Sequence, residues 1–168
     1  IVCDMITGVF VYNLSKKKYS ETMSICVGGF FILNPAMIIN SSFWGQVDSV
    51  FTLFLVLMVY FVSEKKMIQS YFMFALAIFI KPQAFIFTPI IIYGIIENIF
   101  LPKFNKDLFW KNLLCGLGAI AMIFILALPF GIGNVINQYV STMASYPYAT
   151  ENAVNIWGAL GQNWVKMT

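Results

Sequence analysis

Six polar side chains lie beside or within apolar segments of this chain, where they need a chemical explanation. They are, in chain order, Asp4, Trp44, Gln46, Asp48, Lys81 and Gln83. A lysine at the centre of a membrane costs about 2.5–3.5 kcal/mol, and intramembrane carboxylates are functional candidates by default. Lys81 either extends its ammonium group to the membrane surface or, if the turn at 81–83 is recessed, has an anionic partner. The sequence offers Asp48, Asp4 or a lipid phosphate for this role. We expect these polar residues to bind a substrate, with Asp48 and Lys81 lining one outer cavity beneath residues 146–157.

The chain has no histidine, which removes the commonest general base and the commonest zinc ligand. Any proton transfer must therefore use a carboxylate or a group outside the chain, and Asp48 is the candidate catalytic carboxylate. Asp48 is explained equally well as an acidic residue in the first turn of a helix, where the helix dipole favours it. The cysteines Cys3, Cys26 and Cys115 have no metal-ligand spacing, so no metal site is expected.

A stretch near the end of the sequence mixes aromatic rings with amide and hydroxyl groups. It runs from residue 146 to 157 and contains the candidate binding residues Tyr146, Tyr148, Asn152, Asn155 and Trp157. Sugar C–H faces stack on rings, and sugar hydroxyls need amide partners, so this composition suits carbohydrate. The alternative is an aromatic belt at a membrane interface.

The composition indicates which elements must position these residues. Sixty per cent of the residues are apolar and 10% are charged, whereas a soluble domain averages about 25% charged. The pattern predicts an all-α, polytopic transmembrane helical bundle with short or broken helices and interfacial helices. We expect one transmembrane domain over residues 1–168. Its six membrane segments are expected at about 1–14, 20–40, 47–63, 67–80, 84–100 and 113–130, with an outer loop at 131–168.

The lysines predict the orientation of these segments. The net charge is +3 and all ten basic residues are lysines, gathered in short connections rather than on a surface typical of nucleic-acid binding. Under the positive-inside rule, eight lysines lie on the cytoplasmic side, and only Lys81 and Lys166 lie outside. The eight are Lys16, Lys17, Lys18, Lys65, Lys66, Lys103, Lys106 and Lys111.

Residues 67–100 allow two interpretations. One is a pair of helices with a turn at 81–83, and the other is one long helix kinked at Pro82. We prefer the pair, because a single helix would lose the charge asymmetry. Met67–Ile80 would then be only about 21 Å long, against a hydrocarbon core of about 30 Å. The turn would lie below the outer surface, where irregular backbone must face protein or a water-filled cavity.

Two further patterns predict interfacial helices, and one dipeptide predicts a bend. The apolar spacing over 133–145 suits a helix lying flat on the outer leaflet, and 104–110 suits a cytoplasmic counterpart. Asn34-Pro35 interrupts an apolar segment. It is either a simple kink or a bend that widens the outer cavity.

Taken together and in order, these motifs resemble a family of membrane enzymes. The carriers are Asn34-Pro35 with Trp44-Gly45-Gln46-x-Asp48, Lys81-Pro82-Gln83 with Pro89, and residues 146–157. The set resembles polyprenyl-phosphate-sugar-dependent glycosyltransferases of the GT-C class, and in particular bacterial relatives of the GPI-anchor second mannosyltransferase. The resemblance covers essentially the whole chain.

The resemblance implies an integral enzyme of a bacterial plasma membrane, acting on the extracytoplasmic side. It would move a hexose, expected to be mannose, from a polyprenyl-phosphate carrier to an acceptor. Lys81 would stand beside the leaving phosphate, and residues 146–157 would cover the sugar or the acceptor. The usual catalytic carboxylate of such families is expected upstream of Ile1. The expected partners are membrane lipid and the lipid-linked donor, with no nucleic acid; protein partners and a divalent metal stay open.

Two other function classes compete with this interpretation. A transporter or lipid-carrier flippase also has broken helices and charges near the membrane midplane. It predicts an inverted repeat and a pathway reaching both faces, whereas the polar motifs here are one-sided and no repeat is found. A non-enzymatic membrane scaffold would leave Asp48 and Lys81 without a purpose.

Overall fold

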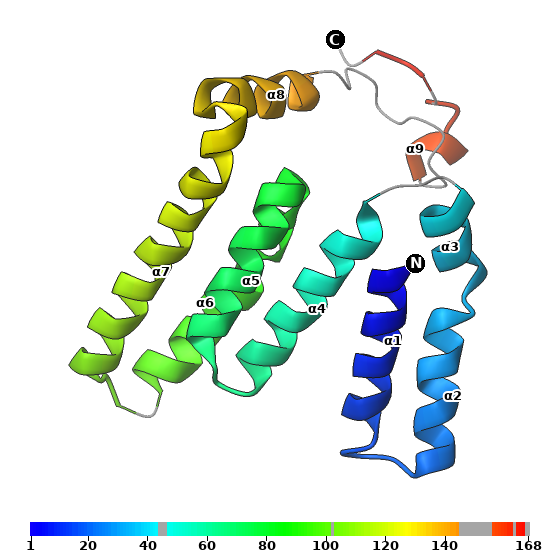
Figure 1. The fold of residues 1–168 in the computed structure, drawn as a ribbon, viewed down its shortest axis with the longest axis horizontal. Coiled ribbons are helices and arrows are strands. Elements are labelled where there is room, and N and C mark those ends of the chain that lie inside the picture. Colours follow the sequence, from blue (N-terminus) through cyan, green and yellow to red (C-terminus); the bar gives the residue numbers. More distant parts are fainter. Residues whose placement is uncertain (44–46, 102, 145–155, 163, 167–168) are drawn as a thin grey trace. The chain divides into compact units, whose positions relative to one another are not determined.

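A computed structural model describes all residues except 44–46, 102, 145–155, 163 and 167–168 (Figure 1). The described residues are almost entirely helical, which confirms the all-α prediction. They form two compact units, Ile1–Ile123 and Phe124–Thr168. Three helical stretches are long and apolar enough to cross a membrane: Glu21–Ser42, Pro82–Phe100 and Lys106–Phe130.

The first unit consists of α-helices joined or extended by short π- and 3-10 helices. They are α1 (Val2–Ser15), α2 (Glu21–Ile32), α3 (Pro35–Ile38), the π-helix η1 (Ile39–Phe43), α4 (Asp48–Ser63), α5 (Met67–Ile80), the 3-10 helix η2 (Pro82–Phe87), α6 (Thr88–Ile95), the π-helix η3 (Ile96–Phe100) and most of α7 (Lys106–Ala127).

The second unit contains the last turn of α7, the 3-10 helix η4 (Leu128–Phe130), α8 (Ile132–Ala144) and α9 (Ile156–Ala159). Gly131 separates η4 from α8 with a positive φ of 78°, a conformation that glycine adopts without steric cost. The helix predicted over 133–145 is confirmed as α8. The predicted outer loop is therefore partly helical.

Two glycines bring α1 and α2 together as an antiparallel pair (Figure 1). A Cβ added to Gly8 would collide with the Ile32 side chain, and one added to Gly28 would lie 2.9 Å from the Tyr12 Cβ. Small residues at such contacts are how membrane helices approach closely without a hydrophobic driving force. This close pair carries Asp4 on α1 and leads through α2 to the polar residues of η1.

Helices α4 and α5 form a tight hairpin around the buried core. The Ser70 hydroxyl of α5 donates to the Met58 carbonyl of α4 at 3.3 Å, and both side chains are fully buried. The turn follows a Schellman pattern, in which the Lys66 amide bonds to Phe61 and the Lys65 amide bonds to Val62. Lys65 takes the left-handed position with φ 56°, where glycine is usual.

Residues 67–100 form a pair of antiparallel helical segments, as preferred: α5, and then η2, α6 and η3. The end of the second segment lies beside the start of α5. A Cβ on Gly94 would lie 2.9 Å from both Val62 and Met67. The Asn98 amide donates to the Lys65 carbonyl at 3.3 Å. Pro82 disfavours the helical conformation in the residue before it, and Lys81 is extended there. The single kinked helix is thereby excluded.

The predicted interfacial helix over 104–110 is wrong, because α7 begins at Lys106 and continues to Ala127. Asn105 caps this helix: its Oδ1 accepts hydrogen bonds from the Asp107 and Leu108 amides, each at 3.0 Å. No proline lies between Lys106 and Ala127, so nothing stops the helix that Asn105 starts.

Asn34-Pro35 does more than kink a helix. Helix α2 ends at Ile32, and Asn34 then caps α3, its Oδ1 accepting from the Ala36 amide at 2.9 Å. Pro35 occupies the first helical position, where its missing N–H costs nothing. The break redirects the chain into η1, which carries Asn40 and Ser41 to the polar cluster described below.

Candidate functional site

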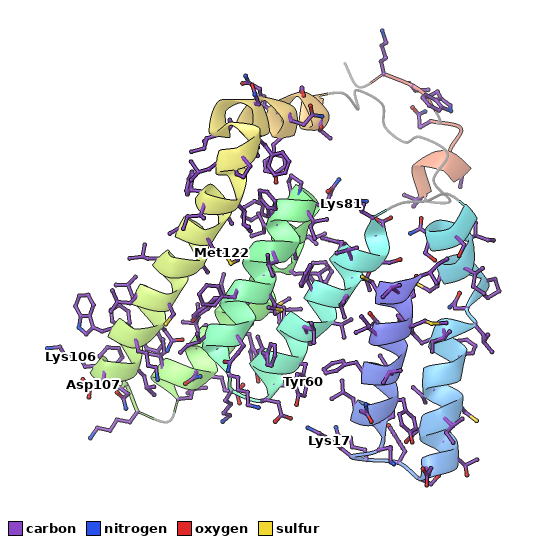
Figure 2. All side chains as sticks on the ribbon, viewed as in Figure 1. Lys17, Tyr60, Lys81, Lys106, Asp107 and Met122 are labelled. Carbon is purple, nitrogen blue, oxygen red and sulfur yellow. The ribbon has the colours of Figure 1, made fainter. Side chains whose placement is uncertain are left out.

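The polar residues of the first unit gather at its two opposite ends (Figure 2). Lys17, Tyr60, Lys106 and Asp107 lie at one end, and Lys81 lies at the other. We call these the lysine end and the polar end. At the lysine end, Lys17 pairs with Glu64 at 2.8 Å. The predicted separation of Lys81 from the other lysines of this unit therefore exists in three dimensions.

The centre of the polar end is an ion pair between Asp48 of α4 and Lys81 at the end of α5. Their side chains are 27% and 29% exposed, so the pair is partly withdrawn from solvent but open to a ligand. The Asn40 side-chain amide donates to the second Asp48 oxygen at 3.1 Å. The structure thus joins the two residues that the sequence predicted to share a cavity.

The local sequence explains this geometry. Asp48 is the first residue of α4, where its charge interacts favourably with the helix dipole. Asp48 makes no side-chain cap bond, so its place in the first turn and its contact with Lys81 coexist. Lys81 has φ −142° and ψ 119° because Pro82 follows it, and this extended backbone ends α5.

Asp4 lies in the same region but is almost completely buried. The residue is 7% exposed, and the hydroxyls of Ser41 and Ser49 lie close to its carboxylate. Neither hydroxyl makes a well-formed hydrogen bond to it among the described residues. A carboxylate so short of partners is costly, so Asp4 marks a place where polarity has been kept at the expense of stability.

Sequence reasoning missed three members of this cluster: Asn40, Ser41 and Ser49. A signal was available, because Asn40-Ser41-Ser42 directly follows the long apolar run Ile25–Ile39. Three consecutive polar residues at a membrane boundary are also typical of a surface turn, so they did not stand out as site residues. Only the packing of α1 and η1 against the start of α4 brings Asn40 to Asp48 and Ser41 to Asp4.

An apolar groove begins one turn below the polar end. Its volume is 480 Å³, and it continues along α4 to Ser63. Phe51 and Thr52 follow Asp48 by three and four residues, so they lie on the same helix face. The lining residues are Leu14, Phe51, Thr52, Leu55, Val56, Val59, Tyr60, Ser63 and Phe87. The groove could hold the hydrocarbon chain of a lipid whose polar head lies beside Lys81.

Of the remaining predicted site residues, the structure describes Gln83 fully and Trp157 in part. Gln83 is exposed on η2. Trp157 belongs to α9, but its side chain lies outside the described residues. The others lie wholly outside them: Trp44, Gln46, Tyr146, Tyr148, Asn152 and Asn155. The predicted cover formed by residues 146–157 stays a prediction.

A model of the family described as GPI transamidase subunit PIG-U matches residues 1–153 of the chain. The chain belongs to this family. Together with the three membrane-length helices, the match makes it an integral membrane protein. No solved structure matches it.

Curated relatives carry the name of a glycosyltransferase. The chain is 25% identical over 121 residues to GPI mannosyltransferase 1 of Kluyveromyces lactis, covering 71% of this chain and 29% of the relative. It is 32% identical over 96 residues to GPI mannosyltransferase 1 of Candida albicans, covering 55% of this chain and 24% of the relative. The chain thus spans less than a third of these relatives. They carry the name of the first GPI mannosyltransferase, whereas the sequence motifs pointed to the second.

Proposed function

We propose that this protein transfers a mannose residue from a polyprenyl-phosphate carrier to an acceptor on the extracytoplasmic side of the membrane. The observation that carries this proposal is the partly exposed Asp48–Lys81 pair, which lies one turn of α4 from an apolar groove. The names of the curated relatives support the choice of mannose. The separation of Lys81 from the lysine end supports the choice of side.

In this proposal, Lys81 binds the phosphate of the donor while the groove along α4 holds the first part of its prenyl chain. The acceptor hydroxyl attacks the anomeric carbon, the bond from that carbon to the phosphate oxygen breaks, and the lipid phosphate leaves with the electron pair. A cation beside the leaving phosphate stabilises the charge that develops there. The phosphate would compete with Asp48 for Lys81.

Release of Asp48 from its pair suits a second role. The proton of the acceptor hydroxyl must pass to a base, and a chain without histidine has carboxylates for this task. Asp48 is the candidate base, held in place by Asn40 at 3.1 Å. Asp4, at 7% exposure, offers little surface to a sugar. We assign it a positioning role, beneath Ser41 and Ser49.

The test is a transfer assay with the full-length protein in proteoliposomes. Radiolabelled polyprenyl-phosphate mannose is the donor, and membranes from a strain lacking the gene supply the acceptor. We expect Lys81→Ala and Asp48→Asn each to reduce the initial rate by about 100-fold or more. Lys18→Ala is the matched control, because Lys18 is exposed in the loop after α1, and it should transfer at the normal rate.

A second candidate function comes from the description of the family, which names a transamidase subunit. A subunit of that kind would use the same site to hold a lipid without transferring sugar. Donor binding that depends on Lys81, without any transfer of label, would favour this candidate. Movement of labelled donor across the vesicle membrane without transfer would favour a flippase.

A further inference from the structure

Two cavities meet at the lysine end, where the proposed transferase has no use for them. The first, which we call the basic cavity, has a volume of 130 Å³ and lies between the start of α5, η3 and the first turns of α7. Its lining includes Lys65, Lys66, Gln69, Asn98, Lys111 and Asn112. At about 30 Å³ per water molecule, this space holds roughly four waters, enough for a phosphate group.

The basic cavity carries positive charge that nearby acids do not neutralise. Lys65 is balanced by Glu97 at 3.6 Å. Glu64 interacts electrostatically with Lys66 but pairs with Lys17 at 2.8 Å. Asp107 precedes Lys111 by one turn of α7. Lys66 and Lys111 have no ion pair within 4 Å among the described residues. Both ammonium groups can therefore approach an anion without first breaking a close ion pair.

The start of α5 adds to this field. Lys66 is its N-cap residue and provides no side-chain cap. The next three residues, Met67, Ile68 and Gln69, border the basic cavity. The first amides of a helix have no partner within it, and they carry the positive end of its dipole. Unneutralised lysines and uncapped amides thus face the same small space.

The second cavity, which we call the apolar cavity, adjoins the first. Its volume is 290 Å³, close to the lower limit of typical ligand pockets. It lies among α5, η3 and α7, and its lining includes Tyr71, Ile95, Ile99, Leu113, Gly116 and Ile120. Apart from the Tyr71 hydroxyl and Asn112, these side chains offer no polar group to a ligand.

Asn112 lines both cavities and forms their shared wall. The residue is buried at 8% exposure. Its Oδ1 accepts from the Tyr71 hydroxyl at 2.8 Å, and its Nδ2 donates to the Leu108 carbonyl at 2.7 Å. Because its hydrogen bonds are made within the protein, Asn112 fixes α7 against α5. A ligand occupying both spaces must be anionic at one end and hydrocarbon at the other.

We propose that this pair of cavities binds one anionic phospholipid of the bilayer. Its headgroup phosphate lies in the basic cavity against Lys66 and Lys111, and one acyl chain lies in the apolar cavity beside Gly116. Basic pockets between membrane helices bind anionic headgroups on this principle. The site is at the end of the bundle opposite Asp48 and Lys81, so it is independent of the proposed transfer reaction.

The chain offers variants that address each half of the site. Lys66→Ala combined with Lys111→Ala removes the unneutralised charges, and Lys18→Ala is the matched control for surface charge. Gly116→Phe fills the apolar cavity, because a Cβ at Gly116 meets nothing within 4 Å. Gly29→Phe is its control, since Gly29 on α2 is equally unobstructed and lies outside both cavities.

The experiment is native mass spectrometry of the full-length, delipidated protein titrated with phosphatidylglycerol. We expect the double lysine variant to weaken binding by about 25-fold, from roughly fivefold for each lysine. Gly116→Phe should weaken it by roughly tenfold through exclusion of methylene groups. Both controls should bind as the unmodified protein does, and phosphatidylcholine should bind more weakly. Circular dichroism would establish that all variants are folded.

Several results would overturn the proposal. Equal binding of phosphatidylcholine, or an equal loss in Lys18→Ala, would show nonspecific attraction. Unchanged phosphatidylglycerol binding in Gly116→Phe, together with displacement by inorganic phosphate, would reveal a free-phosphate site. Tighter, Lys111-dependent binding of polyprenyl phosphate would assign the cavities to a carrier lipid instead of a bilayer phospholipid.

Discussion

The two ends of the first unit use lysine in opposite ways. At the lysine end, charges lie in exposed connections, where Lys17 pairs with Glu64 and also lies 5.2 Å from the Tyr60 ring. At the polar end, Lys81 is partly buried against Asp48, with Asn40 bound to the same carboxylate. Exposed pairs contribute little to stability, whereas a partly buried pair is costly to break. The comparison shows that lysine lies mostly exposed in an ion pair at one end and partly buried in an ion pair with a further amide partner at the other.

The strongest test of this comparison is a double-mutant cycle on the polar end. Asp48→Asn or Lys81→Met alone should lower the free energy of unfolding by about 2–3 kcal/mol, because each leaves the other charge unpaired. The double variant should lose less than the sum of the two. Reversible unfolding in mixed micelles measures all four proteins. Simple additivity would mean that the two residues do not act as a pair.

A second test measures how much the close contact between α1 and α2, which supports the polar end, contributes to stability. Gly28→Leu should destabilise the protein by about 1–3 kcal/mol, because its side chain would overlap Tyr12 at the α1–α2 contact. Gly29→Leu should change stability by less than about 0.5 kcal/mol, since a Cβ there meets nothing within 4 Å. The same unfolding assay compares the two. Similar losses in both would argue against close packing of α1 on α2.

At the lysine end, one substitution should increase stability. Lys65 holds a left-handed conformation at the end of α4, so Lys65→Gly should stabilise the protein by about 0.5–1 kcal/mol. Lys66→Gly is the control, because Lys66 has a negative φ of −95° and gains nothing from glycine. A stabilised Lys66→Gly with an unchanged Lys65→Gly would contradict the assigned turn.

The smallest effect is expected from the exposed pair at the lysine end. The hydrogen bond from Lys17 lowers the pKa of Glu64 and, reciprocally, raises the pKa of Lys17. The contribution of Glu64 is present above its ordinary pKa and is lost as the pH falls through its lowered value. The contribution of Lys17 is present below its ordinary pKa and is lost as the pH rises through its raised value.

Lys17→Ala should therefore give an unfolding free energy that differs from the unmodified protein by the same small amount between about pH 5 and pH 9. Thermal unfolding at several pH values measures this, with Lys18→Ala as the control. A difference that grows across neutral pH would show that a buried group, rather than the exposed pair, responds to the change.

Periodicity and charge were sufficient to predict most of the helices and the separation of the lysines. Long apolar runs have few alternatives to helix in a membrane, because every backbone group must be satisfied internally. The apolar residues over 104–110 predicted a separate interfacial helix, so the start of α7 was missed. The hydrogen bonds by which Asn105 caps α7 are what set its start at Lys106. The site was predicted in part: Asp48 and Lys81 stood out because charge is costly there, but Asn40, Ser41 and Ser49 looked like ordinary boundary residues.

The sequence by itself determined which residues are too polar for their segments, and that Lys81 stands apart from the lysines of the short connections. Both follow from the cost of charge in a membrane, which depends on residue type and position along the chain. Only the tertiary structure decided that Asp48 meets Lys81, that Asn40 joins them, and that Asp4 is buried beneath. Those contacts depend on how α1, η1, α4 and α5 pack, and packing depends on side-chain shapes and glycine contacts far apart in the sequence.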